Sequence, residues 1–579
     1  MLAVTNWLTR TALGLFIGVC AANAAVLVDF QVAQPPPLPK DAKQCTEVLI
    51  VHTFGNSFGT PAIANFTPPT DCGPVGSWAG ISLNLTVTSN GTQFDRLGIF
   101  TFQNTEIWRT STPEPTFDGI IWTYLKDVTR FIPLFSKPGE FIFELDNLLE
   151  TGLNGQYAST VTATFFASSP SHPAAKNANL ILPISASSNP TPDDNAPSVP
   201  PNINTNVTFP DNTVEVYAEI FASGNGNEEF WYFNTANEFL DDLPAGTTFG
   251  DGPFREVQLL VDGMLAGAVF PYAVIFTGGI IPTAWRPITS YGALDLPTYF
   301  IDLTPFVPIL TDGKSHNISL GVISAETDHA INDNWFVSGL VQIVTDTSSK
   351  PTTGEITKYE VQPFPVTSTT AVVGAQLGDV NVTVSATRSV HIESRIVSGS
   401  GKVNNVVFTQ DLSYKNVQTY ANQAAIQNVA QTATGTVTST HNGVTSLTDK
   451  YSFPLNINLT LLNPSGSEFS AFFDHSYDRT ILPAPFIFGS TIAERQLAGG
   501  FFTVASTGNT GNGTSNNTFT YVDTAGNTFD REVSAALDNI TSDHQGGSLA
   551  GTQPKFPFFP KAQAILGGSV RLPGRRIQT

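Results

Sequence analysis

The chain has 579 residues, too many for one hydrophobic core, and its 27 basic and 48 acidic residues give a formal net charge of -21. This charge excludes the basic footprint that nucleic-acid binding requires, so we expect no nucleic-acid partner. Only 13% of the residues are charged, and Gly, Pro and β-branched residues are abundant. The composition favours short strands joined by turns and predicts an all-β protein of several domains.

Residues 1–24 predict a secretory signal peptide. Arg10 precedes an apolar run at residues 11–20, and the run ends in a small-x-small pattern at residues 22–24. These are the parts of a cleavable signal, and the run is too short to span a bilayer comfortably. We therefore expect a secreted, extracellular protein without membrane association once the signal is removed. An uncleaved N-terminal anchor is the alternative.

Cysteines and glycosylation sequons fit a secreted protein. Cys20 lies in the predicted signal, which leaves Cys45 and Cys72. Two cysteines in an oxidising compartment predict a disulfide, with two free buried thiols as the alternative. Asn-x-Ser/Thr sequons, the acceptor pattern for N-linked glycans, occur at ten positions: Asn65, Asn84, Asn90, Asn206, Asn317, Asn381, Asn458, Asn512, Asn516 and Asn539.

Two β-sandwich domains are predicted in the first part of the chain. A proline-rich lead at residues 25–43 precedes the first, at residues 44–184, whose strands alternate as in Phe141–Leu145. A Ser/Asn/Pro linker at residues 185–204 leads to the second, at residues 205–346. There, Glu256–Val261 followed by an Asp-Gly pair predicts a hairpin.

A C-terminal β-rich domain is predicted at residues 355–543. Its sequence is rich in Ser, Thr, Val, Asn and Gln, and no tryptophan follows Trp335. The pattern is that of a further β-sandwich with little chemistry of its own. Residues 544–579 predict a loose tail.

Familiar catalytic motifs are absent from the sequence. There is no Gly-x-Ser-x-Gly elbow and no His-Glu-x-x-His, and the eight histidines are scattered without ligand spacing. We therefore expect no metal and no cofactor. Carboxylates, guanidiniums and aromatic rings remain as candidate functional groups.

The densest cluster of such groups contains Asp95 and Arg96, followed closely by Trp108 and Arg109. Asp95 is either a cleft residue or a turn carboxylate that precedes a strand at Leu97–Phe102. Asp146 ends the candidate strand Glu140–Leu145 and, taken alone, is a residue of a strand-exit turn. In the second domain a glycine-containing segment leads into Glu228–Tyr232, which is either a loop that cradles a sugar or a surface loop with its aromatic rings folded inward.

A series of motifs resembles the secreted peptide:N-glycosidase A family of plants and fungi. The motifs span about residues 40–350: Gln93–Arg96, Trp108–Thr116, Lys126–Arg130, Gly252–Val257, Phe276–Ile280 and Trp285–Ile288. The resemblance implies hydrolysis of the amide that joins an N-linked glycan to asparagine, which leaves aspartate. Acidic conditions, tolerance of core fucose and independence of metal are further implications. N-glycosylated peptides and glycoproteins are the partners this predicts.

A more distant resemblance, to the bacterial peptide:N-glycosidase F family, implies two jelly rolls side by side with the site between them. It assigns the essential aspartate to Asp95 and a second carboxylate to Asp146, where that family has Glu. The third carboxylate stays open among Glu229, Asp251 and Glu256.

The hypothesis on roles makes Asp95 the general base and lets Arg96 and Arg255 stabilise charge. Asp146 and a second-domain glutamate, Glu229 or Glu256, bind the sugar and assist proton transfer. The side chains expected to bind substrate are Trp108, Arg109, Trp231, Trp285 and Arg286. Two alternatives remain: a non-catalytic glycan-binding or cell-wall protein, and a glycosidase with two carboxylates that leaves a sugar stub.

Overall fold

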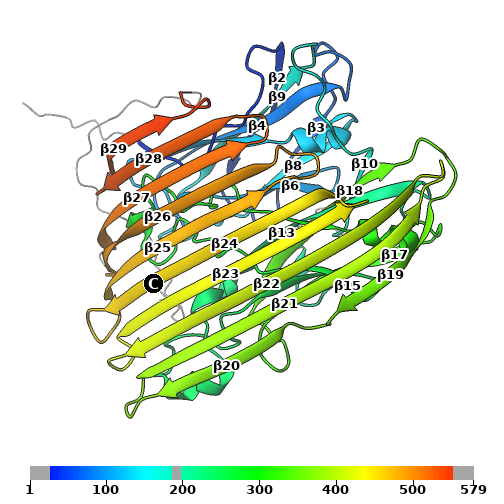
Figure 1. The fold of residues 1–579 in the computed structure, drawn as a ribbon. Coiled ribbons are helices and arrows are strands. Elements are labelled where there is room, and N and C mark those ends of the chain that lie inside the picture. The colour runs from blue at the N-terminus through cyan, green and yellow to red at the C-terminus, as the bar shows by residue number, and fades with distance from the viewer. Residues whose placement is uncertain (1–25, 186–196, 507, 552–579) are drawn as a thin grey trace, which may run out of the picture.

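The computed structural model describes residues 26–185, 197–506 and 508–551, and strands dominate it (Figure 1). The predicted all-β fold class is therefore confirmed. The predicted signal peptide, most of the linker and most of the tail lie outside the described residues. Within the described ranges, no helix is long and apolar enough to cross a membrane. The helical segments are single turns or little more: α1 (Ile132–Phe135), α2 (Val307–Leu310), η1 (Thr129–Phe131), η2 (Gly226–Glu228), η3 (Trp231–Phe233), η4 (Asn237–Asp242), η5 (Pro282–Trp285) and η6 (Thr304–Phe306).

The first block is a sandwich of two sheets with an aromatic core. Rings from the two sheets meet edge to face, as where Phe54 lies 5.0 Å from Phe143 between ring centroids. One sheet has the order β1 (Leu27–Asp29), β7 (Ile120–Asp127), β4 (Trp78–Ser89), β9 (Tyr157–Ala167), β2 (Gln44–Phe54). The other has the order β3 (Ala62–Phe66), β8 (Gly139–Leu145), β5 (Leu97–Phe102), β6 (Thr105–Ser111).

The predicted disulfide is confirmed. Cys45 on β2 and Cys72, in the connection that follows β3, are bonded, with their Cα atoms 5.9 Å apart. The bond closes the start of the first block, which holds the edge strand β2 to the chain that leads into β4.

The second block also has two sheets, and it contains the predicted hairpin. Asp262 and Gly263 both have positive φ, 48° and 81°, which is the geometry of a tight two-residue turn between β14 (Glu256–Val261) and β15 (Met264–Val269). One sheet is β10 (Leu180–Pro183), β18 (Asn334–Thr345), β13 (Thr213–Asn225), β16 (Tyr299–Asp302), with β11 (Ser198–Val199) also on β18. The other is β12 (Ile203–Val207), β17 (His316–Ile323), β14 (Glu256–Val261), β15 (Met264–Val269).

The C-terminal region is one antiparallel sheet of 11 strands, which Figure 1 shows as a single broad layer. The expectation of a separate sandwich there is wrong, because the second layer is the second block. The path runs β19 (Thr353–Val361), β21 (Val380–Val397), β22 (Val403–Ala421), β23 (Ile426–His441), β24 (Val444–Leu461), β25 (Glu468–Ile481), β26 (Ser490–Thr503), β27 (Thr510–Asp523), β28 (Thr528–Ala536), β29 (Asn539–Gly546), with β20 (Val366–Val373) beside β21.

Amides on the inner face of this sheet bind backbone of the second block. Gln410 accepts from Ala268 N at 2.9 Å and donates to Ala268 O at 3.0 Å. Gln418 donates to the carbonyl of Asn234 at 2.8 Å. Along β22 the residues alternate between buried and accessible, as a strand with one covered face requires. One contiguous hydrophobic cluster then contains residues of both the second block and the sheet.

The first and second blocks are joined by buried ion pairs and by backbone hydrogen bonds. Arg130 makes two hydrogen bonds to Glu219, at 2.9 and 2.6 Å. The edge of β6 pairs with a segment of the second block: Ser111 N donates to Ala293 O at 2.7 Å, and Leu296 N to Arg109 O at 3.0 Å. Buried, doubly hydrogen-bonded ion pairs have a fixed geometry. The two blocks are therefore held rigidly relative to each other at this junction.

Candidate active site

Two carboxylates face one point at the junction of the first and second blocks. Asp95 lies half-buried in the loop between β4 and β5, and Glu114 lies in the loop after β6 with only 1% of its surface exposed. A Cβ atom built on Gly278, from the second block, would come within 3.0 Å of Asp95 Oδ1 and of Glu114 Oε1. Because Gly278 carries no side chain, both carboxylates approach its backbone.

Thr112 fixes the loops that carry these groups. The backbone N of Arg96 donates to Thr112 Oγ1 at 2.9 Å, and Thr112 N donates back to Arg96 O at 2.9 Å. The hydroxyl of Thr277 donates to Thr112 O at 2.7 Å, which ties the second block to the same residue. The positions of Asp95, Glu114 and Gly278 therefore depend on one another.

Tyr157 holds the loop that carries Asp95 through a hydrogen bond to its backbone. Its hydroxyl donates to the carbonyl of Phe94 at 2.7 Å. Burial raises the pKa of Tyr157 well above its usual value, and the charges of Glu114 and Asp95 add to this, while Thr112 and Arg96 oppose it. The hydroxyl thus keeps its proton and remains a donor.

Arg286 is the guanidinium that accompanies Glu114. Its Nη2 atom lies 3.6 Å from Glu114 Oε2, and both side chains are buried. Arg286 follows η5, whose last residue, Trp285, donates from its indole to the carbonyl of Gly279 at 2.8 Å. Trp285 therefore holds the glycine loop through its carbonyl, and Arg286 places a positive charge beside Glu114.

Arg96 and Asp146 share one neighbourhood. Arg96 donates to Gln93 Oε1 at 2.8 Å and to Asn147 Oδ1 at 3.3 Å. Burial raises the pKa of Asp146, against the opposing effects of the Gly59 N–H, 3.0 Å away, and of the Arg96 charge. The structure thus brings three predicted site residues, Asp95, Arg96 and Asp146, onto adjoining loops.

Arg255 is not brought to this site. It is fully buried, and its guanidinium binds both oxygens of Glu228, at 2.5 and 2.6 Å. Its Nη1 atom donates to three carbonyls, including that of Asp251 at 2.8 Å. Burial works to raise the pKa of Glu228, but the Arg255 charge and the donors around the carboxylate outweigh it and hold that pKa below its usual value.

The three candidates for the third carboxylate lie in different surroundings. Glu256 forms an ion pair with Arg388 of the C-terminal sheet, and burial raises its pKa in spite of that partner. Asp251 accepts from Asn237 at 2.9 Å. Glu229 is buried, and a Cβ built on Gly279 would lie 3.6 Å from the ring of its neighbour Phe230. Of the three candidates, Glu229 is therefore the one whose chain neighbour packs against the glycine loop.

The other residues predicted to bind substrate lie in the interior. Trp108 stacks on Phe100 with ring centroids 4.7 Å apart. Trp231 packs beside Trp335, at 5.9 Å between ring centroids. Arg109 binds Glu106 at 2.8 and 2.7 Å and the carbonyl of Phe336 at 2.7 Å, so it links the two blocks.

Glu114 is the site residue to which sequence reasoning gave no role. It lies within the Trp108–Thr116 motif, between Pro113 and Pro115. A carboxylate flanked by two prolines is the signal that could have singled it out, because proline fixes the backbone on both sides.

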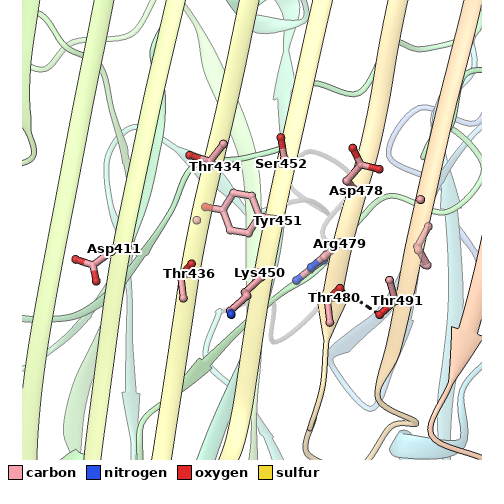
Figure 2. A pocket seen from close by; sticks show the side chains of 13 residues that line it. Asp411, Thr434, Thr436, Lys450, Tyr451, Ser452, Asp478, Arg479, Thr480 and Thr491 are labelled. Atoms are coloured by element: carbon pink, nitrogen blue, oxygen red, sulfur yellow. Dashed lines mark hydrogen bonds between the residues drawn. The ribbon is translucent and has the colours of Figure 1, made fainter.

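A polar hollow on the C-terminal sheet is a separate feature (Figure 2). Its lining residues all belong to β22–β26, and Figure 2 shows Asp411, Lys450 and Asp478 among threonines of neighbouring strands. None of the loops that carry Asp95, Glu114 or Gly278 contributes to this lining. The hollow is therefore distinct from the carboxylate site.

The fold and site together define an all-β protein with a pair of carboxylates and a guanidinium at the junction of two sandwiches. A family model described as peptide N-acetyl-beta-D-glucosaminyl asparaginase amidase A matches residues 35–362. A second, described as the PNGase_A C-terminal domain, matches residues 381–455. The chain belongs to the peptide N-acetyl-beta-D-glucosaminyl asparaginase amidase A family, which confirms the resemblance found in its motifs.

One curated relative is the peptide-N4-(N-acetyl-beta-glucosaminyl)asparagine amidase A of Prunus dulcis. The two sequences are 35% identical over 355 residues. The match covers 58% of this chain and 61% of the relative, so it spans less than two thirds of the length of that protein.

Proposed function

We propose that this protein releases N-linked glycans by hydrolysing the amide between the glycan and an asparagine side chain, which converts the asparagine to aspartate. The observation that carries the proposal is the pair Asp95 and Glu114, which face one point beside Gly278. Membership of the amidase A family and the similarity to the peptide-N4-(N-acetyl-beta-glucosaminyl)asparagine amidase A of Prunus dulcis support the same chemistry. The substrates are N-glycosylated peptides and glycoproteins.

The reaction needs a base for water and an acid for the leaving nitrogen. In the proposed mechanism, Asp95 takes a proton from water as the water oxygen attacks the amide carbon. The C–N bond then breaks, and the leaving glycosylamine nitrogen receives a proton held by the carboxylate pair. Peptide aspartate and a free glycosylamine are the products, so the atoms balance.

Arg286 is the charge-stabilising group in this proposal, in place of the Arg255 of the sequence hypothesis. It already lies beside Glu114, whereas the guanidinium of Arg255 is fully engaged by Glu228 and carbonyls. A guanidinium in a buried site can stabilise the oxyanion that forms as water adds. Arg96 orients the Asp95 loop, and Glu229 or Asp146 contacts the sugar.

Secretion is part of the proposal. The Cys45–Cys72 disulfide supports an oxidising compartment, because such bonds are rare where thiols are kept reduced. A glycosylated, secreted hydrolase agrees with the sequons and with the signal-like start of the sequence.

Mass spectrometry of one glycopeptide tests the function. Incubation with the purified protein is expected to give a peptide with aspartate at the former glycosylation site. A peptide that keeps one N-acetylglucosamine would show a glycosidase instead, and binding without any mass change would show a glycan-binding protein. Asp95→Asn is expected to abolish the conversion without changing the unfolding temperature. Glu150→Gln, an exposed carboxylate of the same block, serves as the matched control.

A further inference from the structure

Two exposed phenylalanines form a pair on the outer face of the C-terminal sheet. Phe472 on β25 is 47% exposed, and Phe501 on β26 is 50% exposed. Their rings meet edge to face, with centroids 6.3 Å apart. In the described structure these are the exposed phenylalanines that lie within strands, the others being in loops. An exposed apolar patch on a polar sheet commonly marks a surface that something covers.

Each of these phenylalanines lies directly across from a sequon asparagine. Asn458 on β24 is the cross-strand partner of Phe472, and Asn512 on β27 is the cross-strand partner of Phe501. Residues opposite each other in an antiparallel pair point to the same face, with Cβ atoms about 4.5–5.5 Å apart. A group attached to either asparagine amide therefore starts within reach of the ring.

These asparagines point away from the second block. The neighbours of Asn458, Ile457 and Leu459, are buried on the inner face. The neighbour of Asn512, Gly513, has no room for a Cβ because the carbonyl of Thr283 lies against it. Strand residues alternate between faces, so Asn458 and Asn512 lie on the outer face, where the structure exposes both.

The same register recurs at two more sequons of this sheet. Asn516 is opposite the exposed Leu497, and Asn381 is opposite the exposed Val372. A contrasting case lies in the second block, where the sequon asparagines Asn206 and Asn317 are directly opposite each other. Two glycans there would compete for the same space.

We propose that N-linked glycans on Asn458 and Asn512 lay their first N-acetylglucosamine on Phe472 and Phe501, so that the protein's own glycans cover this aromatic pair. The C–H groups on one face of a pyranose are apolar and pack on the face of an aromatic ring, whose quadrupole favours them. Asn516 with Leu497 and Asn381 with Val372 extend the covered surface. The inference rests on the proposed secretion and not on the amidase activity.

The side chains of Asn512 and Phe472 are oriented so that they can carry and contact such sugars. Asn512 Oδ1 accepts the backbone N–H of Phe501 at 3.3 Å, which leaves Nδ2 for the glycosidic bond. The ring of Phe472 lies over Gly499, whose added Cβ would collide with it. In the modifying step, the bond between the anomeric carbon and the diphosphate of a polyisoprenyl-diphosphate oligosaccharide breaks. The new bond forms to Nδ2, which loses one proton.

Site-resolved mass spectrometry of protein secreted from a eukaryotic host is the first test, and a double-mutant cycle is the second. Glycans are expected on Asn458 and Asn512. Phe472→Ala is expected to lower the unfolding temperature by about 1 °C or more in the glycosylated protein and to change it little in the Asn458→Gln background. Phe501→Ala with Asn512→Gln repeats the cycle. Val522→Ala is the control, because this exposed valine lies on the same face opposite Thr491 and Thr528.

Unoccupied asparagines, or an equal effect of the phenylalanine changes with and without the glycan, would overturn the inference. Equal effects would show that the phenylalanine rings contribute to stability without any contact with the sugars. If an asparagine variant is not secreted, trimming the glycans of the wild type and of Phe472→Ala to a single N-acetylglucosamine provides the comparison. The difference in unfolding temperature must then persist with one sugar and disappear after its complete removal. Glycopeptide turnover is measured separately. It tests the amidase function alone, so a failure of the glycan contact can be told from a failure of that function.

Discussion

The hydroxyl of Thr277 donates to the carbonyl of Thr112 at 2.7 Å, one residue before Gly278 and two residues before Glu114. This bond joins a loop of the second block to a loop of the first at the point where the two carboxylates face the glycine. Neither block alone contains the candidate site. The rigid, buried ion pairs of the junction are what allow loops from separate sandwiches to keep this arrangement.

Glu114→Gln is expected to lower kcat by about 100-fold or more in a variant that still folds. The amide keeps the shape of the side chain but can no longer exchange a proton or pair with Arg286, and positioned acid–base groups typically contribute about 10²–10⁴-fold. Steady-state turnover of a fluorescent glycopeptide measures the effect. Glu150→Gln must retain wild-type kcat, and full activity of Glu114→Gln would remove Glu114 from the mechanism.

Gly278→Ala is expected to lower activity by about 100-fold, because the new methyl group enters the space of both carboxylate oxygens. Either Asp95 and Glu114 move apart or the glycine loop shifts, and both outcomes misplace the reacting groups. Turnover and circular dichroism melting are measured together. Retained kcat in a folded variant would show that the space beside Gly278 is not where the reaction takes place.

Arg255→Met is expected to destabilise the fold by about 3–5 kcal/mol, because it leaves the buried carboxylate of Glu228 without its cation. The double variant Arg255→Met/Glu228→Gln should recover part of that loss, since no buried charge remains. Chemical denaturation measures both. A folded Arg255→Met protein with normal stability and greatly reduced kcat would instead restore Arg255 to the catalytic role that the sequence suggested.

His441→Gln is expected to lower stability at acidic and neutral pH but not at alkaline pH. Burial works to lower the pKa of His441, but hydrogen bonds and charges from Asp302 and Glu215 outweigh it and raise that pKa from 6.5 to about 9. The folded state thus binds a proton that the unfolded state releases at lower pH, so the stabilisation is full below about pH 6.5 and is lost as pH rises through about 9. The shift corresponds to about 3 kcal/mol.

Denaturant unfolding of the wild type and His441→Gln between pH 6 and about pH 10 measures this difference. The two curves of unfolding free energy against pH should converge at the alkaline end. Parallel curves would show that His441 is neutral in the folded protein and that its contacts with Asp302 and Glu215 do not depend on its charge.

Local sequence patterns determined much of the architecture because they act over short distances. Alternation along Phe141–Leu145, the Asp262-Gly263 turn and the lone pair Cys45 and Cys72 each predicted what the structure contains, since strand period, turn geometry and pairing by elimination need no knowledge of distant contacts. Motif resemblance likewise directed attention to Asp95 and its loop.

Only the tertiary structure decided which charged groups meet. Arg255 and Glu256 stand in a family-like motif, yet each pairs with a carboxylate or guanidinium from elsewhere in the chain, at Glu228 and Arg388. Glu114 gains its candidate role only because Gly278, more than 150 residues later, brings a bare backbone against it. The sequence by itself determines which side chains can be charged and which segments form strands. Packing two sandwiches and a broad sheet together decides which of those charges are neutralised in the interior and which face one another at a site.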